Sequence, residues 1–95
     1  MAHFFYKLVP PRTSFAQDMS AEEAAMMGQH AAYWKGRIDS GVKVFALGPV
    51  ADPAGVFGMA VMEVESEAAA HELARRDPAI VQTQFGLKCI RCRVG

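Results

Sequence analysis

Residues 20–39, SAEEAAMMGQHAAYWKGRID, decide the fold of this chain. Ser20 can accept a hydrogen bond from the first turn of a helix, and Glu23 three residues later completes a capping box. Acidic residues then occupy the first turn and basic residues the last, as the helix macrodipole favours. Gly41 follows as the expected left-handed stop. The stretch therefore predicts one long amphipathic helix.

One face of this helix is predicted to meet the core. At about 100° per residue, a single apolar stripe is formed by Met27, Ala31, Trp34 and Ile38. His30 falls about 60° to one side of that stripe. We therefore expect the imidazole of His30 at the margin between core and solvent.

Four strands and a second helix are predicted around the long helix. The strands are expected at 2–9, 42–47, 56–64 and 86–94, and the second helix at 67–76 with Ser66 as its cap. Pro10-Pro11 ends the first strand and Gly48-Pro49 the second. Residues 12–19 are expected as a polar connection, with one further helical turn within 79–84.

The predicted order β-α-β-β-α-β indicates an α+β fold. Two right-handed crossovers give the ferredoxin-like arrangement, a four-stranded antiparallel sheet with two helices on one face. The 95 residues suffice for a single domain, 1–95, with one modest core.

The second and third strands are apolar on both faces, although helices can cover only one. One face is predicted to carry the large side chains Phe45, Leu47, Phe57, Met59 and Val61. Exposing either face to water is costly, so we expect a homodimer through the face that the helices leave uncovered. The sequence leaves open which face that is, although the small Gly58 and Ala60 suit close approach of the helices on their side.

Composition excludes several classes of function. Ten basic and ten acidic side chains cancel, which argues against a nucleic-acid binder. No apolar run approaches the roughly 20 residues of a membrane span, and the N-terminus does not resemble a signal peptide. We therefore expect a cytoplasmic protein with no nucleic-acid or membrane partner.

His30 and Asp77 are the predicted catalytic residues. Both helices lie on one sheet face, so Asp77, in ARRDPAI at the end of the second helix, can orient the His30 ring and set its basicity. The alternative is structural. His30 would then be bound to a backbone carbonyl, and Asp-Pro would be a helix-terminating turn.

The predicted substrate-binding residues are Arg12, Arg37, Tyr33 and Trp34. Arg12 or Arg37 could hold an anionic group, and either could instead be solvated or paired with an acid. Tyr33 and Trp34 share the helix of His30.

No metal or cofactor is expected. Cys89 and Cys92 spell C-x-x-C, but residues three apart in a strand point to opposite faces, which argues against a disulfide or a zinc site. His3, His30 and His71 lack metal-ligand spacing.

Several segments together resemble the YCII-related (YciI-like) proteins. These segments are PPR after the first strand, M-x-x-H-x-x-Y-W in the long helix, GPV-x-DP-x-G at 48–55, and ARRDPAI. The resemblance implies a fold of the dimeric α-β barrel group and a His–Asp site, here His30 and Asp77. Some relatives act in the breakdown of chlorinated aromatics, and muconolactone isomerase is similar in architecture.

Two classes of function stay open on the sequence. The first is a cofactor-free enzyme in which His30 and Asp77 transfer protons on a small anionic or aromatic molecule, as an isomerase, lyase or dehydrochlorinase. The second is a non-catalytic domain that binds a small ligand or a partner. A His30–Asp77 contact at the base of an open cleft would favour the enzyme.

Overall fold

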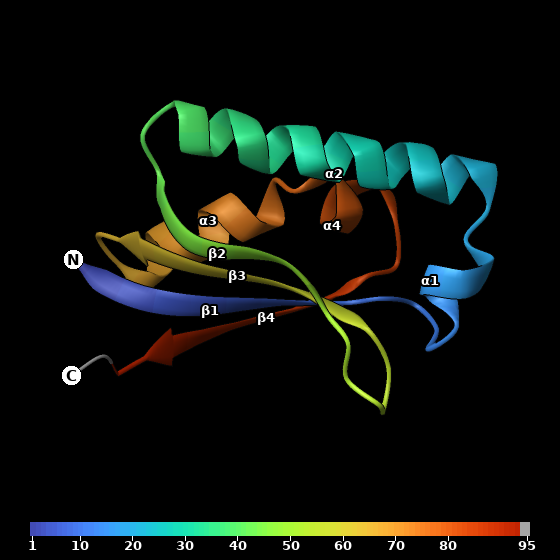
Figure 1. Ribbon diagram of the computed structural model, residues 1–95. Coiled ribbons are helices and arrows are strands. Elements are labelled where there is room, and N and C mark those ends of the chain that lie inside the picture. Colours follow the sequence, from blue (N-terminus) through green and yellow to red (C-terminus); the bar gives the residue numbers. More distant parts are fainter. Residues whose placement is uncertain (94–95) are drawn as a thin grey trace.

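The chain alternates strands and helices in the predicted order, and the computed structural model describes residues 1–93 (Figure 1). The predicted α+β, ferredoxin-like fold is confirmed. The elements are β1 (Ala2–Val9), α1 (Phe15–Asp18), α2 (Ala21–Asp39), β2 (Lys43–Val50), β3 (Phe57–Val64), α3 (Glu67–Arg75), α4 (Pro78–Gln82) and β4 (Gly86–Cys92).

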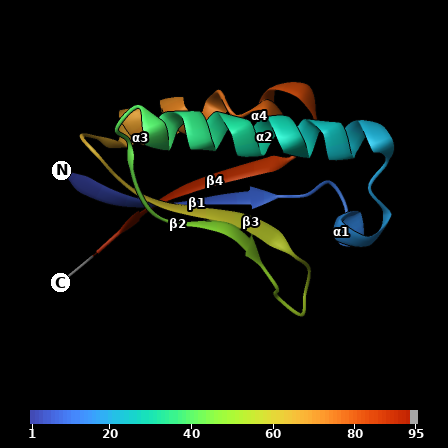
Figure 2. The ribbon, with the colours of Figure 1, turned by 45° about the horizontal axis from the view of Figure 1, so that its top comes forward.

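The four strands form one sheet in the order β2-β3-β1-β4, with every neighbouring pair antiparallel. Helix α2 runs along one face of this sheet, and α3 and α4 lie beside it on that face (Figure 2). Because both crossovers pass over the same face, side chains of α2 and α4 can meet above the central strands.

The core lies between the sheet and these helices. Alternate residues of β1 and β3 point into it and are buried: Phe4, Tyr6, Leu8, Ala60, Met62 and Val64. From the helices it receives Met26, Trp34, Ala70, Ala74 and Ala79. This period-two burial is what the strand patterns predict.

Helix α2 begins as predicted but buries a different stripe. Ser20 Oγ accepts a hydrogen bond from the Glu23 amide at 3.1 Å, and the Ser20 amide donates to Glu23 Oε1 at 2.8 Å. The predicted stripe is wrong at Ala31 and Ile38, which are exposed.

Two hydrogen bonds explain why α2 is rotated about its axis relative to the prediction. His30 and Trp34 both donate hydrogen bonds to the carboxylate of Asp77, which lies beneath the helix. Buried polar groups must be paired, so these contacts determine which face of α2 packs against the sheet. His30 is only partly buried, with 16% of its side chain exposed, which agrees with its predicted position at the margin between core and solvent.

Strand β2 continues to Val50, so the prediction that Gly48-Pro49 ends it is wrong. Strand β2 is at the edge of the sheet. An edge strand tolerates proline because its outer side has no ladder partner to which an amide would donate.

A bulge in β2 corrects the predicted faces. The register shifts between Val44, opposite Met62, and Ala46, opposite Val61. An extra residue in one strand turns every later side chain over. Leu47 therefore shares the helix-side face with its partner Ala60, whereas Phe45 stays on the outer face beside His3.

Two short helices occupy the predicted connections. The 12–19 segment, expected as a polar connection, contains α1, because buried Phe15 packs edge-on against Phe85 at 5.0 Å between ring centroids. Helix α4 is the expected further turn and begins one residue earlier, at Pro78, which suits the first helical position.

The outer face of the sheet has no helix over it and is largely apolar. Phe45 is 62% exposed and Ile90 is 51% exposed. The register pairs Cys89 with core-facing Tyr6 and Cys92 with outward-facing His3. The two thiols are free and on opposite faces, as alternation predicts. Strand β4 ends at Cys92, and the predicted last residue, Val94, lies outside the described residues.

Candidate active site

Asp77 is placed by the start of α4. Its side chain caps this helix, with Oδ1 accepting a hydrogen bond from the Ala79 amide at 2.9 Å. Aspartate followed by proline is a favoured way to begin a helix, because proline needs no amide partner there. The side chain of Asp77 is 0% exposed, so each of its oxygen atoms requires partners inside the protein.

Three side chains from two other elements supply those partners. His30 Nδ1 lies 2.8 Å from Oδ1 and 2.7 Å from Oδ2 of Asp77, which confirms the predicted approach of the pair. Trp34 Nε1 donates to Oδ2 at 2.8 Å. Tyr6 Oη, rising from β1, donates to Oδ2 at 3.1 Å. The carboxylate thus joins β1, α2 and α4.

This surrounding keeps Asp77 ionised. Burial opposes the charge, but hydrogen bonds from His30, Trp34 and the Ala79 amide outweigh it, and the pKa of Asp77 is lowered. Burial, and then the charge of Asp77, raise the pKa of Tyr6, so the phenol keeps its proton and acts as a donor. The result is an ionised carboxylate surrounded by hydrogen-bond donors.

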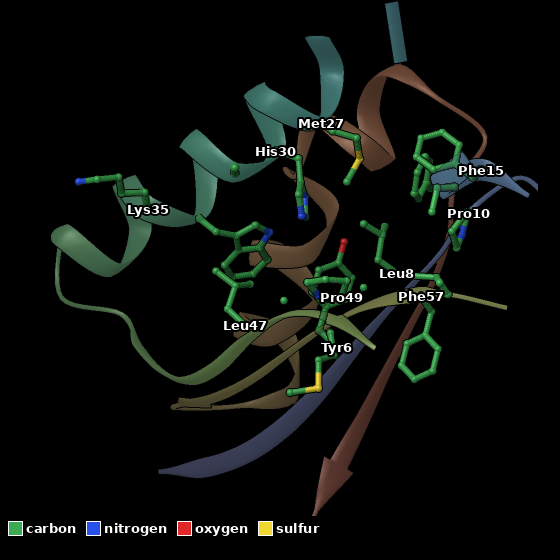
Figure 3. Close-up of a pocket in the computed structure, with 18 of the residues that line it drawn as sticks. Tyr6, Leu8, Pro10, Phe15, Met27, His30, Lys35, Leu47, Pro49 and Phe57 are labelled. Atoms are coloured by element: carbon green, nitrogen blue, oxygen red, sulfur yellow. The ribbon is translucent and has the colours of Figure 1, made fainter. Parts of the chain in front are cut away.

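The same contact orients His30. An ionised carboxylate accepts a hydrogen, which assigns the proton of the neutral imidazole to Nδ1. The lone pair is then on Nε2, which has no hydrogen-bond partner among residues 1–93. The ring is 16% exposed and points from α2 into a cavity (Figure 3).

The cavity has a volume of about 560 Å³ and opens between α2, α1 and the ends of β1, β2 and β3. Its wall is mostly apolar and includes Leu8, Phe15, Met27, Leu47 and Pro49. Ala31 and Ile38, the exposed part of the predicted α2 stripe, also line it. A volume of this size is typical of small-molecule sites.

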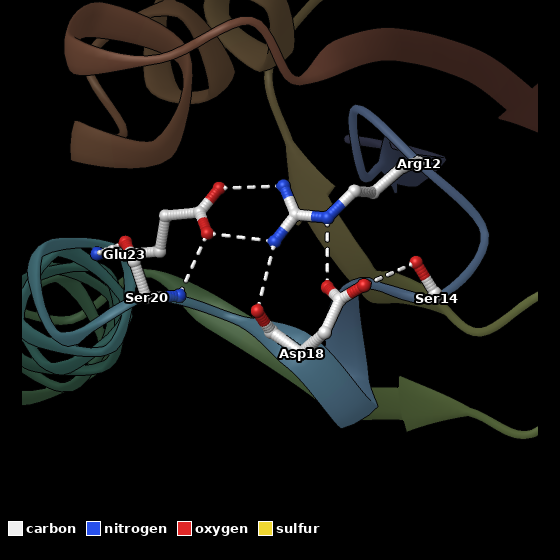
Figure 4. Close-up of polar contacts among 5 residues, drawn as sticks. All are labelled: Arg12, Ser14, Asp18, Ser20 and Glu23. Atoms are coloured by element: carbon white, nitrogen blue, oxygen red, sulfur yellow. Dashed lines mark hydrogen bonds and ion pairs between the residues drawn. The ribbon is translucent and has the colours of Figure 1, made fainter.

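Arg12 is not part of the cavity wall and is held by acidic side chains (Figure 4). Its guanidinium donates to both Glu23 oxygens, at 2.9 and 2.8 Å, and to Asp18 Oδ1 at 2.7 Å. These bonds raise the pKa of Arg12, and the bond from Arg12 lowers the pKa of Glu23 to about 2. The network, which Ser14 extends by donating to Asp18 at 2.6 Å, ties α1 to the start of α2.

Of the other predicted substrate-binding residues, only Trp34 lies beside the cavity, and its side chain is fully buried there. Tyr33 donates from its hydroxyl to the Leu73 carbonyl at 2.6 Å. The Arg37 guanidinium lies 5.8 Å from the centre of the Tyr33 ring. Tyr33 therefore joins α2 to α3, Arg37 packs on Tyr33 within α2, and both side chains lie outside the cavity wall.

Tyr6 is the site residue that the sequence analysis missed. A signal was present, since Tyr6 alternates with Phe4 and Leu8 on the core face of β1. A buried tyrosine hydroxyl requires a partner. For Tyr6 that partner is Asp77, which lies above β1.

Within 1–93, no group of three or more His, Cys, Asp or Glu side chains is arranged to hold a metal ion. None of the helices in this part of the chain is long and apolar enough to cross a membrane.

Fold and site together define a class, an α+β domain in which a buried aspartate orients a histidine at the wall of an apolar cavity. Residues 7–90 match the YCII-related domain. Because the match spans most of the 95 residues, the chain belongs to the YCII-related family. A comparison with curated proteins gave no match.

Proposed function

We propose that this protein is a cofactor-independent enzyme that transfers protons on a small molecule bound in the cavity beside His30. His30 acts as the general acid/base, and Asp77 holds the ring and stabilises its protonated form. The observation that carries the proposal is the contact of His30 Nδ1 with fully buried Asp77, at 2.7 Å, with Nε2 left for the cavity.

The proposed step begins with neutral His30. A C–H or O–H bond of the ligand breaks, its proton goes to Nε2, and the electron pair stays on the ligand. The imidazolium keeps its Nδ1 proton on the Asp77 carboxylate, so it forms beside a fixed negative charge. Return of the proton to another ligand atom completes an isomerisation, and loss of a leaving group completes an elimination.

The cavity favours this proposal over a purely structural pair. A closed, dry His–Asp contact would support a non-catalytic domain, whereas His30 here lines an open space of about 560 Å³. Catalysis by one positioned acid/base contributes about 10²–10⁴-fold. Activated carbon acids and hydroxyl groups are therefore suitable substrates.

We also propose that the protein works as a homodimer in the cytoplasm. Support for the dimer is the apolar outer face of the sheet, on which Phe45 and Ile90 are more than half exposed. Support for a reducing compartment is the pair of free thiols, Cys89 and Cys92.

The test of the enzyme is proton–deuterium exchange. A panel of small ketones, lactones and phenols is incubated with the protein in D₂O, and exchange is followed by proton NMR. His30→Gln should lower protein-dependent exchange by about 10²–10⁴-fold, the contribution of one acid/base group. His71→Gln is the matched control, because His71 is on α3 and outside the cavity wall. Equal exchange by wild type and His30→Gln would remove His30 from the chemistry.

A further inference from the structure

We infer that the ligand of this cavity is uncharged when it binds, with an apolar body and one polarised C–H or O–H group that meets His30 Nε2. This inference rests on the proposed function and adds the class of substrate. Of the anionic and aromatic substrates expected from the sequence, it excludes the anionic ones, which Arg12 or Arg37 would have held.

The cavity wall offers few polar groups. It is built mainly from aliphatic, aromatic, methionine, glycine and proline residues, and only Tyr6, His30, Lys35 and Asp39 carry titratable groups. The Tyr6 hydroxyl is used by Asp77. A ligand with several polar groups would lose water without gaining partners, which is unfavourable.

Among residues 1–93, the cavity wall contains one Lys or Arg side chain, that of Lys35, and its ammonium already pairs with a carboxylate. Lys35, near one end of the cavity, pairs with Asp39 at 3.0 Å between Nζ and Oδ2 (Figure 3). Arg12 is held by two carboxylates, and Arg37 lies over Tyr33. Neither arginine is part of the wall.

Asp77 adds a direct argument from charge. With His30 neutral and ready to accept a proton, the pair carries one negative charge, on a side chain that is 0% exposed. A bound carboxylate would bring a second negative charge into the same poorly solvated space. An uncharged ligand avoids that repulsion and becomes anionic only as His30 becomes cationic.

Two probes of nearly equal shape test this. 2-Acetylnaphthalene is uncharged, and 2-naphthoate replaces its methyl ketone with a carboxylate. Trp34 is the only tryptophan and lies beside the cavity, with Nε1 donating to Asp77. Its indole N–H resonance in ¹H–¹⁵N spectra therefore reports occupation of the site. We expect the ketone to shift this resonance with at least a tenfold lower Kd than the carboxylate. Equal or tighter binding of 2-naphthoate would overturn the inference.

Two variants separate charge from shape. Asp39→Asn removes the carboxylate that pairs with Lys35. This variant should lower the Kd of 2-naphthoate by a larger factor than it changes the Kd of 2-acetylnaphthalene, most clearly at low salt. Asp39 is exposed, so this variant should fold. Asp77→Asn removes the buried charge and should narrow the gap between the probes, provided that its near-UV circular dichroism is that of the wild type. A gap unchanged in Asp39→Asn would contradict the role of charge.

The remaining outcomes distinguish failure of this inference from failure of the proposed function. If neither probe shifts the Trp34 resonance, the inference is wrong, and sedimentation then tells whether a further copy of the chain fills the cavity. If the ketone binds selectively but His30→Gln leaves exchange of its methyl protons unchanged, the proposed function fails while the ligand class stands. Selective binding together with exchange that depends on His30 supports both.

Discussion

Tyr6 and Trp34 donate to the same oxygen of Asp77 from the two layers of the fold, the hydroxyl at 3.1 Å from the sheet and the indole at 2.8 Å from α2. Their rings also pack together, with centroids 5.5 Å apart. The carboxylate that orients His30 is thus itself oriented by the central strand and the long helix. Tyr6 and Trp34 take no proton in the proposed step, but through Asp77 they fix the direction in which Nε2 of His30 points.

Removing one of these donors should weaken the fold and the orientation of His30 together. Tyr6→Phe keeps the ring but deletes a hydrogen bond to a charged group, so we expect a loss of about 1.5–3 kcal/mol in the free energy of unfolding. Chemical denaturation measures this loss. Tyr33→Phe is the matched control, because the Tyr33 hydroxyl donates to a neutral acceptor, the Leu73 carbonyl. This variant should lose only about 0.5–1.5 kcal/mol in the free energy of unfolding. Equal losses in the two variants would contradict a special role for Tyr6.

Because Asp77 is ionised in the folded protein, the free energy of unfolding should depend on pH in the acidic range. Its pKa in the folded protein is below the ordinary value of 3.8. A depressed carboxyl contributes stability that is complete above the ordinary pKa and is lost as pH falls through the folded pKa. Asp77→Asn should therefore be about 1.5–3 kcal/mol less stable than wild type at pH 7, with the gap closing below about pH 4. Denaturation at several pH values tests this, and a gap that grows in acid would contradict it.

The Arg12 network should hold α1 against the start of α2. Arg12→Gln removes the bonds to Asp18 and Glu23, so amide exchange in residues 13–18 should become faster. Lys35→Gln is the control, since it breaks an exposed pair within α2 and should leave that exchange unchanged. Mass-spectrometric hydrogen exchange distinguishes the two. Slow exchange in both variants would show that Phe15 packing alone is sufficient.

The proposed dimer should depend on the outer face of the sheet. Phe45→Lys places a charge on that face at a side chain that is 62% exposed, so the monomer should keep its fold. Sedimentation at micromolar concentration should give about twice the chain mass for wild type and a lower mass for the variant. Val81→Lys, at a 67% exposed apolar residue of α4, should remain a dimer. A wild-type protein that sediments as a monomer would sink the proposal.

Local signals were sufficient for the fold. The capping box at Ser20, the proline at 78 and the alternation along β1 act within a few residues, and they located most elements. Features decided by neighbours in space were not predictable in this way. Pro49 could stay in β2 only because that strand is at the edge, and the bulge that turned Leu47 inward depends on pairing with β3.

The His30–Asp77 pair was predictable because topology places both crossovers on one face. Its surroundings were not, because they follow from the rotation of α2. The same rotation left Ala31 and Ile38 to line the cavity and took Tyr33 and Arg37 away from it. A rotation of this kind is set by buried hydrogen bonds between elements distant in sequence, which helical periodicity alone does not contain.

The joining of three elements by one carboxylate has a consequence for the order of assembly. During synthesis Tyr6, His30 and Trp34 leave the ribosome long before Asp77, and α2 cannot settle on β1 without leaving a phenol and an indole unpaired. A nascent chain that stops short of residue 77 therefore lacks the acceptor that its own core requires. Proteolytic fragments from the N-terminal half should therefore be degraded instead of accumulating.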